Sequence, residues 1–355
     1  MSNNVRLGFC TIPFLICAML FALTVSGAGG QEKKLKVPQW SHAFDLACRK
    51  FKEKDITKDT KRWGVEAFRD NNTGAAGVGL YISEEGSIAL APHFDNLELP
   101  LKPSKGPDWK TGLDLPARKA GVEKWEKTTK VHSMEVFRDP NTDNWLFVTE
   151  LGNIAATNGK LFPGKSGADP KWVHSVDLQV RKGGVKEFKD ATKFGIEVYS
   201  DGNTGNLVYI TENGFVAIVP DEKGVTLDPK VKAKSPEWLH GLDLSCRKFD
   251  EKSFTKDTRK FGVEVYNDLQ TGNLIFISET GSIAVTPAAA TVPAPTSKAK
   301  EPTWTHGLNL KCRKFGEKEF SPTTRSFGAE VFRDENINVT IYVNELGNIT
   351  VMSAK

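Results

Sequence analysis

Cysteine is scarce in this chain of 355 residues, which contains only five. Two of them, Cys10 and Cys17, lie in an apolar N-terminal segment, so three remain for the rest of the chain. Three is an odd number and too few for a disulfide framework in a chain of this length. We therefore expect the fold to be held together by packing.

An excess of charge of one sign is also missing. The sequence has 48 Lys and Arg residues against 44 Asp and Glu residues, and the two signs are interspersed. Proteins that bind nucleic acid usually carry a concentrated basic patch. The charge pattern therefore indicates no nucleic acid partner.

Long hydrophobic runs occur only near the N-terminus. Arg6 precedes the apolar residues 9–25, and the small residues Ser26, Gly27 and Ala28 follow. This order is typical of a secretory signal peptide, which we predict over residues 1–28. The alternative, a membrane anchor, fits less well because Pro13 interrupts the run and no Lys/Arg cluster flanks it. We expect a secreted, periplasmic or extracellular mature chain without a membrane span.

Motifs for catalysis and metal binding are missing as well. No His-x-x-x-His, Cys-x-x-Cys or nucleophile-elbow spacing occurs. The hairpin that starts at Asp201 has oxygens at alternate positions, as a calcium loop does, but it lacks the distal glutamate and is predicted to be a plain turn. Each candidate acid or base recurs four or five times, whereas an active site needs one asymmetric set. We expect no enzymatic activity, cofactor or metal.

What the sequence does contain is a repeat. Five segments begin with tryptophan, at intervals of 69, 63, 66 and 66 residues. Such a period indicates a repeat architecture. After an N-terminal segment over residues 29–39, we expect repeats over residues 40–92, 109–157, 172–220, 238–287 and 304–355, separated by Pro/Lys-rich connectors.

Each repeat contains four segments with the alternation of β-strands. In the fourth copy they cover about residues 240–248, 261–267, 274–278 and 282–285, joined by glycine-containing turns. A single four-stranded sheet cannot bury its apolar face alone, so the copies should pack on one another. We predict an all-β fold, a five-bladed β-propeller in one domain. The alternative is a string of small β domains on linkers, which the long connectors would suit.

The number of copies, the four-strand unit and the closing hairpin Leu274-Ile-Phe-Ile-Ser-Glu-Thr-Gly-Ser-Ile-Ala-Val resemble the secreted five-bladed propeller lectins of the tachylectin type. In that family every blade carries a sugar site. The resemblance extends from Trp40 to the C-terminus and concerns architecture. It implies a multivalent lectin-like protein, and no binding residue of those lectins is matched to a position here.

The first strand of each repeat has an apolar and a charged face. Cys48, Cys246 and Cys312 lie on the apolar face and should be small buried hydrophobic residues, the alternative being a disulfide or a reactive thiol. On the charged face an Asp and an Arg recur, and the second strand adds a Glu. We predict that the guanidinium bridges the two carboxylates inside each unit, as a structural ion network; the alternative is a polar cradle for sugar hydroxyls. The network residues are Asp45, Arg49, Glu66, Asp114, Arg118, Glu135, Asp177, Arg181, Glu197, Asp243, Arg247, Glu264, Arg313 and Glu330.

Two further recurrences are candidates for function. A Glu stands two residues before a glycine in each closing hairpin, at positions 84, 150, 212, 279 and 345, and is predicted to be a solvated turn residue. The tryptophans and the histidines two residues later either pack structurally or form a ligand platform. The candidate binding residues are Trp40, His42, Trp109, Trp172, His174, Trp238, His240, Trp304 and His306.

Repeated equivalent sites favour multivalent recognition, because linked sites raise avidity without new contacts. The sequence therefore predicts a binding protein for carbohydrate, cell-surface or other extracellular ligands. The alternative is a structural or protein-interaction scaffold without a small-molecule ligand.

Overall fold

The computed structural model describes residues 35–74, 77–91, 99–100, 105–157, 169–221, 234–288, 292–294, 296 and 298–353. All regular secondary structure in these residues is β-strand. The predicted signal peptide and most of the predicted connectors lie outside the described residues. None of the described residues lies in a helix that is long and apolar enough to cross a membrane.

The strands form five antiparallel sheets of four consecutive strands each. The first sheet contains β1 (Gln39–Cys48), β2 (Lys61–Asp70), β3 (Val78–Ser83) and β4 (Ile88–Ala91). The second contains β5 (Asp108–Ala117), β6 (Lys130–Arg138), β7 (Trp145–Thr149) and β8 (Ile154–Thr157). The third contains β9 (Lys171–Val180), β10 (Thr192–Asp201), β11 (Asn206–Thr211) and β12 (Val216–Pro220). The fourth contains β13 (Glu237–Cys246), β14 (Arg259–Asp268), β15 (Asn273–Ser278) and β16 (Ile283–Pro287), and the fifth β17 (Thr303–Cys312), β18 (Arg325–Asp334), β19 (Val339–Asn344) and β20 (Ile349–Ser353).

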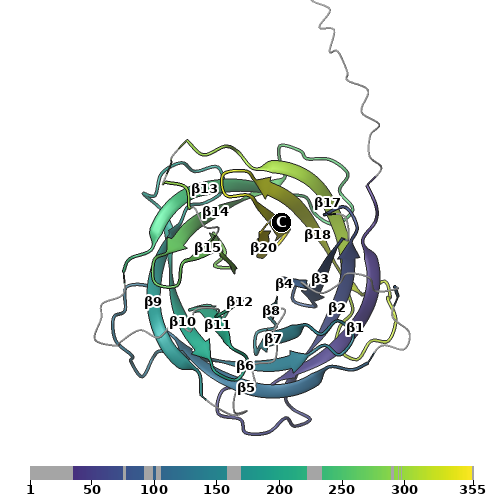
Figure 1. The fold of residues 1–355 in the computed structure, drawn as a ribbon. Coiled ribbons are helices and arrows are strands. Elements are labelled where there is room, and N and C mark those ends of the chain that lie inside the picture. Colours follow the sequence, from purple (N-terminus) through teal and green to yellow (C-terminus); the bar gives the residue numbers. More distant parts are fainter. Residues whose placement is uncertain are drawn as a thin grey trace, which may run out of the picture. The chain divides into compact units, whose positions relative to one another are not determined.

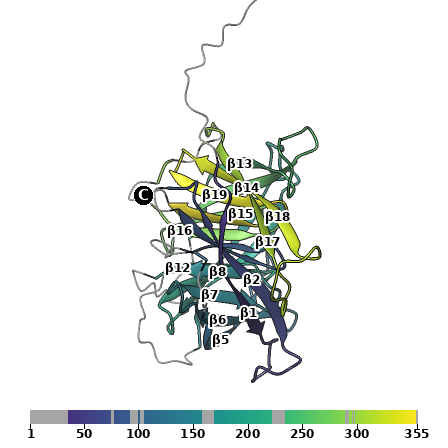
Figure 2. The ribbon, with the colours of Figure 1, turned by 90° about the vertical axis from the view of Figure 1, so that its right-hand side faces the viewer.

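The five sheets are the blades of a β-propeller. In Figure 1 the first strand of each blade lies at the circumference and the fourth strand lies nearest the axis. Figure 2 shows the ring from the side, with β13, β14 and β15 following one another inward. Innermost strands of neighbouring blades contact each other around the whole ring, including β20 with β4. The predicted five-bladed propeller is thus confirmed, and the alternative of separate small domains is wrong.

Each hydrophobic core lies between two blades rather than within one. Five clusters of buried side chains occur, and each combines residues from two adjacent blades. One cluster, for example, joins Leu46 and Tyr81 of the first blade to Leu146 and Val148 of the second. The third strands are accordingly buried on both faces, as in β11 and β15. A blade on its own would expose both apolar faces to water.

No strand is exchanged to close the ring among the described residues, because each sheet is built from consecutive strands. Side chains close it instead. Leu308 and Leu310 of the fifth blade share a cluster with Leu80 and Ile82 of the first. The fifth and first blades therefore meet in the same way as blades that are neighbours in sequence.

Glycine on the second strand allows close approach between blades. A Cβ atom at Gly262 would lie 2.0 Å from the carbonyl oxygen of Arg181 in the preceding blade. Equivalent Cβ atoms would lie 2.2 or 2.3 Å from such an oxygen at Gly64, Gly195 and Gly328. These positions therefore require a residue without a side chain.

Candidate binding sites between the blades

Arginine–glutamate pairs link every blade to the next. The Nε of each Arg at the end of the first strand donates to Oε1 of a Glu on the second strand of the following blade, at 2.5 to 2.7 Å. The Glu side chains are at most 2% exposed. The pairs are Arg49–Glu135, Arg118–Glu197, Arg181–Glu264, Arg247–Glu330 and Arg313–Glu66. Our prediction placed these ion pairs inside each unit, and the structure corrects this because the Glu belongs to the adjacent blade.

The aspartates of the predicted network have a different role. Asp177 accepts a hydrogen bond from the backbone N–H of Gly121 at 2.7 Å, and Asp243 accepts one from Gly184 at 2.9 Å. Asp45 accepts one from Gly316, and Asp114 accepts from the hydroxyl of Ser133. Three of the four aspartates therefore hold a loop of the preceding blade, and no such Asp is bridged to a Glu by Arg as predicted.

The tryptophans use the same buried glutamates. Each indole Nε1–H donates to Oε2 of the Glu in its own blade, at 2.6 or 2.7 Å. The hydrogen bond fixes one edge of the indole, while the ring remains partly in solvent. Trp109 is 50% exposed and Trp172 and Trp304 are 40% exposed, and Trp40 and Trp238 are half-buried. The predicted Trp positions are therefore accessible to a ligand.

A second aromatic side chain faces these tryptophans and was not predicted. It lies in the loop between the first and second strands of the preceding blade. The ring centroids of Phe188 and Trp238 lie 5.7 Å apart, as do those of Phe254 and Trp304, and both pairs are edge-to-face. Phe320 packs likewise on Trp40, at 6.3 Å.

The arginine lies beside both rings. The guanidinium of Arg118 is 4.5 Å from the ring of Trp125 and 5.7 Å from that of Trp172. We call the Arg, the side chain seven residues after it and the Trp of the next blade a rim cluster. The constant spacing of seven residues is the signal in the sequence that could have revealed the second side chain. The members at this position are Ile56, Trp125, Phe188, Phe254 and Phe320.

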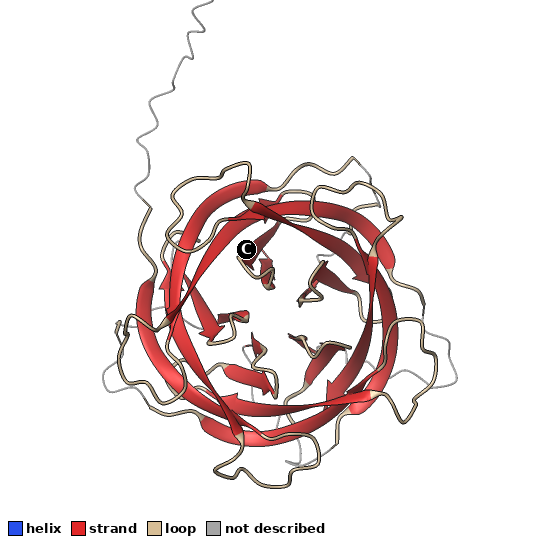
Figure 3. Cartoon of the chain, turned by 180° about the vertical axis from the view of Figure 1, so that it is seen from behind, coloured by secondary structure: helices blue, strands red, loops and turns tan. Residues whose placement is uncertain are grey.

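The loops that carry the rim clusters project outward around the ring. Figure 3 shows them at the circumference, between consecutive blades. The five clusters therefore repeat around the molecule, one at each blade boundary.

The predicted histidines do not reach the rim. His42, His174, His240 and His306 are at most 3% exposed. Each bonds through Nε2 to an Asp of the next blade, at 2.7 to 3.0 Å, and these acceptors are Asp139, Asp268, Asp334 and Asp70. The platform of tryptophan and histidine on one surface is thus contradicted for the histidines.

A β-bulge explains why Trp and His separate. Simple alternation places residues i and i+2 on one face of a strand. The register shifts between Trp238 and His240, and likewise in the other blades, so the two side chains face different surroundings. A bulge of this kind is not visible in the hydrophobic pattern.

The aspartates that are hydrogen-bonded to the histidines also accept hydrogen bonds within their own hairpins. Asp139 accepts hydrogen bonds from the backbone N–H of Asn141 and from the hydroxyls of Thr142 and Tyr81. Burial opposes ionisation of Asp139, but the hydrogen bond and charge of His42 and these hydroxyls outweigh it, so its pKa is lowered. The pKa values of Asp70 and Asp268 are lowered for the same reasons.

The turn glutamates are not simply solvated, as we had predicted. The carboxylate of Glu279 accepts the backbone N–H of Gly183 at 2.6 Å, and that of Glu345 accepts the N–H of Phe249 at 2.7 Å. Each bond joins a turn to a loop of the preceding blade. Burial raises the pKa of the corresponding Glu84 and Glu150.

The three cysteines outside the predicted signal peptide are free and buried. Their thiols contact backbone carbonyls of the next blade, such as Val148 O for Cys48 at 3.4 Å. Burial raises the pKa of each thiol. They pack as small core residues, as predicted, rather than forming a disulfide.

The hairpin at Asp201 is a plain turn, as predicted. Asp201 is bonded within its own turn, to the N–H of Asn203 and the hydroxyl of Thr204. No group of three potential metal ligands occurs in the part of the chain that the structure describes. Residues 159–166 match the spacing Gly-x-x-x-x-Gly-Lys-Ser of phosphate-binding loops and lie outside the described residues.

Comparisons with known proteins give no family for this chain. No protein-family model matches it. No curated protein matches it either. Among solved structures, a catalytically inactive variant of virginiamycin B lyase from Staphylococcus aureus with quinupristin is 12% identical, with a TM-score of 0.12, over 88% of this chain and all of the other. A likeness at this level supports no argument about fold or function.

Proposed function

We propose that this protein is a secreted, multivalent binding protein that holds carbohydrate at the rim clusters. The observation that carries the proposal is the half-exposed indole at each of the five blade boundaries, four of them accompanied by a second aromatic ring. Aromatic rings with one polar edge fixed offer a rigid apolar surface at low entropic cost. The C–H face of a sugar ring can stack on such a surface.

The distribution of exposed apolar side chains supports this assignment. Among the described residues, fifteen large hydrophobic side chains are exposed. Ten of them are rim-cluster members or lie in the loops that carry them, and the ten are Phe51, Ile56, Trp109, Trp125, Trp172, Val185, Phe254, Trp304, Phe315 and Phe320. Apolar residues concentrated on one part of a surface indicate an interaction site.

The loop charges favour a neutral ligand over a polyanion. Counting Lys against Asp and Glu, the loops over residues 50–60, 119–129 and 182–191 each carry +1, and those over 248–258 and 314–324 are neutral. The rim arginines are neutralised by the buried glutamates. Attraction that depends on counterions is therefore weak, and binding should change little with salt. We infer a neutral glycan.

Binding to insoluble neutral polysaccharides and to a glycan array tests the proposal. Trp109→Ala, Trp172→Ala and Trp304→Ala should each weaken retention only a few-fold, and the triple variant should weaken it by about 100-fold, because linked sites multiply avidity. Leu269→Ala, at an exposed apolar residue in the hairpin between β14 and β15 and outside the loops that carry the rim clusters, is the matched control and should bind normally. Absence of any glycan that binds the wild type, or full retention by a folded triple variant, would refute the proposal.

The alternative is a scaffold that contacts its partner through the connectors. Exchanging the connectors while keeping the blades should then abolish partner binding, whereas rim variants should have no effect. We propose a role without catalysis in either case, since the same groups recur at every boundary.

A further inference from the structure

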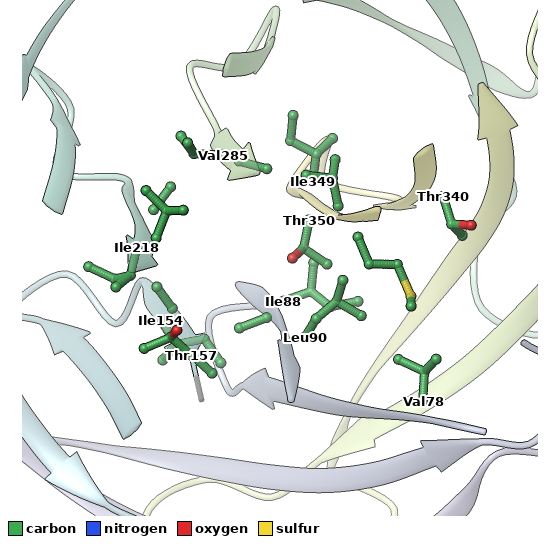
Figure 4. A pocket seen from close by; sticks show the side chains of 18 of the residues that line it. Val78, Ile88, Leu90, Ile154, Thr157, Ile218, Val285, Thr340, Ile349 and Thr350 are labelled. Carbon is green, nitrogen blue, oxygen red and sulfur yellow. The ribbon is translucent and has the colours of Figure 1, made fainter. Parts of the chain in front are cut away.

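The axis of the ring contains a cavity of about 840 Å³. Aliphatic side chains of the innermost strands line it in two tiers, and Figure 4 shows Ile88, Ile154, Ile218, Val285 and Ile349 around it. Each tier takes one residue from the innermost strand of each blade. The first tier consists of Ile88, Ile154, Val216, Ile283 and Ile349, and the second of Leu90, Ala156, Ile218, Val285 and Val351. Serine and threonine line it as well, at Thr73, Ser87, Thr157, Ser282, Thr340, Thr350 and Ser353. The rim clusters have no member among the lining residues.

The cavity departs from fivefold symmetry around the first blade. At one position of the third strand, blades two to four carry Trp145, Leu207 and Leu274, which fill the core against the next blade. The equivalent residues of the first and fifth blades are Gly79 and Thr340, and both line the cavity. The smaller side chains leave room there, so the cavity extends to the hairpin residues 73, 74 and 77 of the first blade.

One charge lies at this widened end. Arg333 lines the cavity, and among the described lining residues it is the only one with a charged side chain. Its guanidinium donates a hydrogen bond to the side-chain oxygen of Asn338 and has further donors. A cation beside two tiers of aliphatic side chains is complementary to a ligand with one anionic group and a long apolar part.

We propose that the axial cavity binds a long-chain fatty acid, with the hydrocarbon chain between the aliphatic tiers and the carboxylate on Arg333. The cavity volume lies within the range of about 300–1,000 Å³ that is usual for small-molecule sites. The proposal is independent of glycan binding at the rim, because the two sites share no residue.

Displacement of the fluorescent fatty acid cis-parinaric acid from the delipidated full chain tests the assignment. Palmitate should compete at micromolar concentration. Arg333→Gln should weaken the binding of palmitate by about tenfold and the binding of hexadecanol by less than about twofold, because only the acid loses a charged hydrogen bond. Arg138→Gln is the matched control, since Arg138 is the equivalent residue of the second blade and does not line the cavity.

A second pair of variants tests the location. Thr340→Leu and Ala156→Ile introduce side chains that other blades carry at the same positions, so the variants should fold, and each should reduce palmitate binding at least about tenfold by filling the cavity. Thermal melting confirms the fold. The proposal is overturned if the wild type binds no palmitate at about 100 μM, if acid and alcohol respond alike to Arg333→Gln, or if both filling variants melt normally and bind as the wild type does.

Discussion

A buried carboxylate at each blade boundary accepts hydrogen bonds from two blades at once. Glu330, for example, receives Arg247 of the preceding blade and Trp304 of its own. Such a group tolerates burial only while its donors are present, because an unpaired buried charge is costly. Stability and the position of the rim tryptophan therefore depend on the same residue.

Loss of the arginine should be far more costly at this boundary than at an exposed pair. Arg247→Ala leaves Glu330 buried without its cation and should lower the free energy of unfolding by about 3–5 kcal/mol. Arg325→Ala removes the exposed pair with Glu85 and should cost about 1 kcal/mol or less. Urea denaturation measures both. Equal losses for the two variants would show that the buried pair is not structural.

The aspartates beside the histidines predict how stability responds to acid. A carboxylate whose pKa is lowered by folding stabilises the protein above its unfolded pKa of about 3.9, and this contribution disappears as the pH falls through the folded pKa. The difference in free energy of unfolding between wild type and Asp139→Asn should thus shrink as the pH falls from about 5 to below about 4. Denaturation of both proteins across this range measures it. A difference that grows in acid would contradict the assignment.

The second strand of each of four blades packs so closely on the preceding blade that adding one methyl group to its glycine should lower the free energy of unfolding. Gly262→Ala places a Cβ atom 2.0 Å from the carbonyl oxygen of Arg181, so the backbone must shift. We expect a loss of about 1–3 kcal/mol in the free energy of unfolding. Gly202→Ala, which has no atom within 4 Å of the added Cβ, should change it by less than about 0.5 kcal/mol. Comparable stability of the two variants would refute the close approach.

The strands of each blade could be predicted from the sequence, whereas the side-chain contacts between blades could not. Tryptophan spacing and four alternating segments predicted the five four-stranded blades, because periodicity reports which faces are apolar. The partner of Arg247 could not be predicted the same way, since alternation shows that a face is charged but not which sheet lies opposite. His240 was placed wrongly beside Trp238 because the bulge between them leaves no trace in the pattern.

At the scale of the whole molecule, the ring closes with the same Arg–Glu pair at all five boundaries and a His–Asp pair at four of them. His306 bonds to Asp70 at 2.8 Å, and His240 bonds to Asp334 at 2.7 Å. The boundary between the second and third blades differs, because Thr111 stands where the others have His. The repetition explains how the first and last blades associate without sharing a strand.

Because every core lies between blades, no blade should be stable alone. The decisive measurement is circular dichroism and proton NMR of an excised fourth blade, residues 237–287, beside the chain from residue 35 onward. The longer chain should unfold in a cooperative transition, and the excised blade should be unfolded, with no dispersed amide signals. A monomeric excised blade that folds cooperatively with the stability of the longer chain would contradict the account.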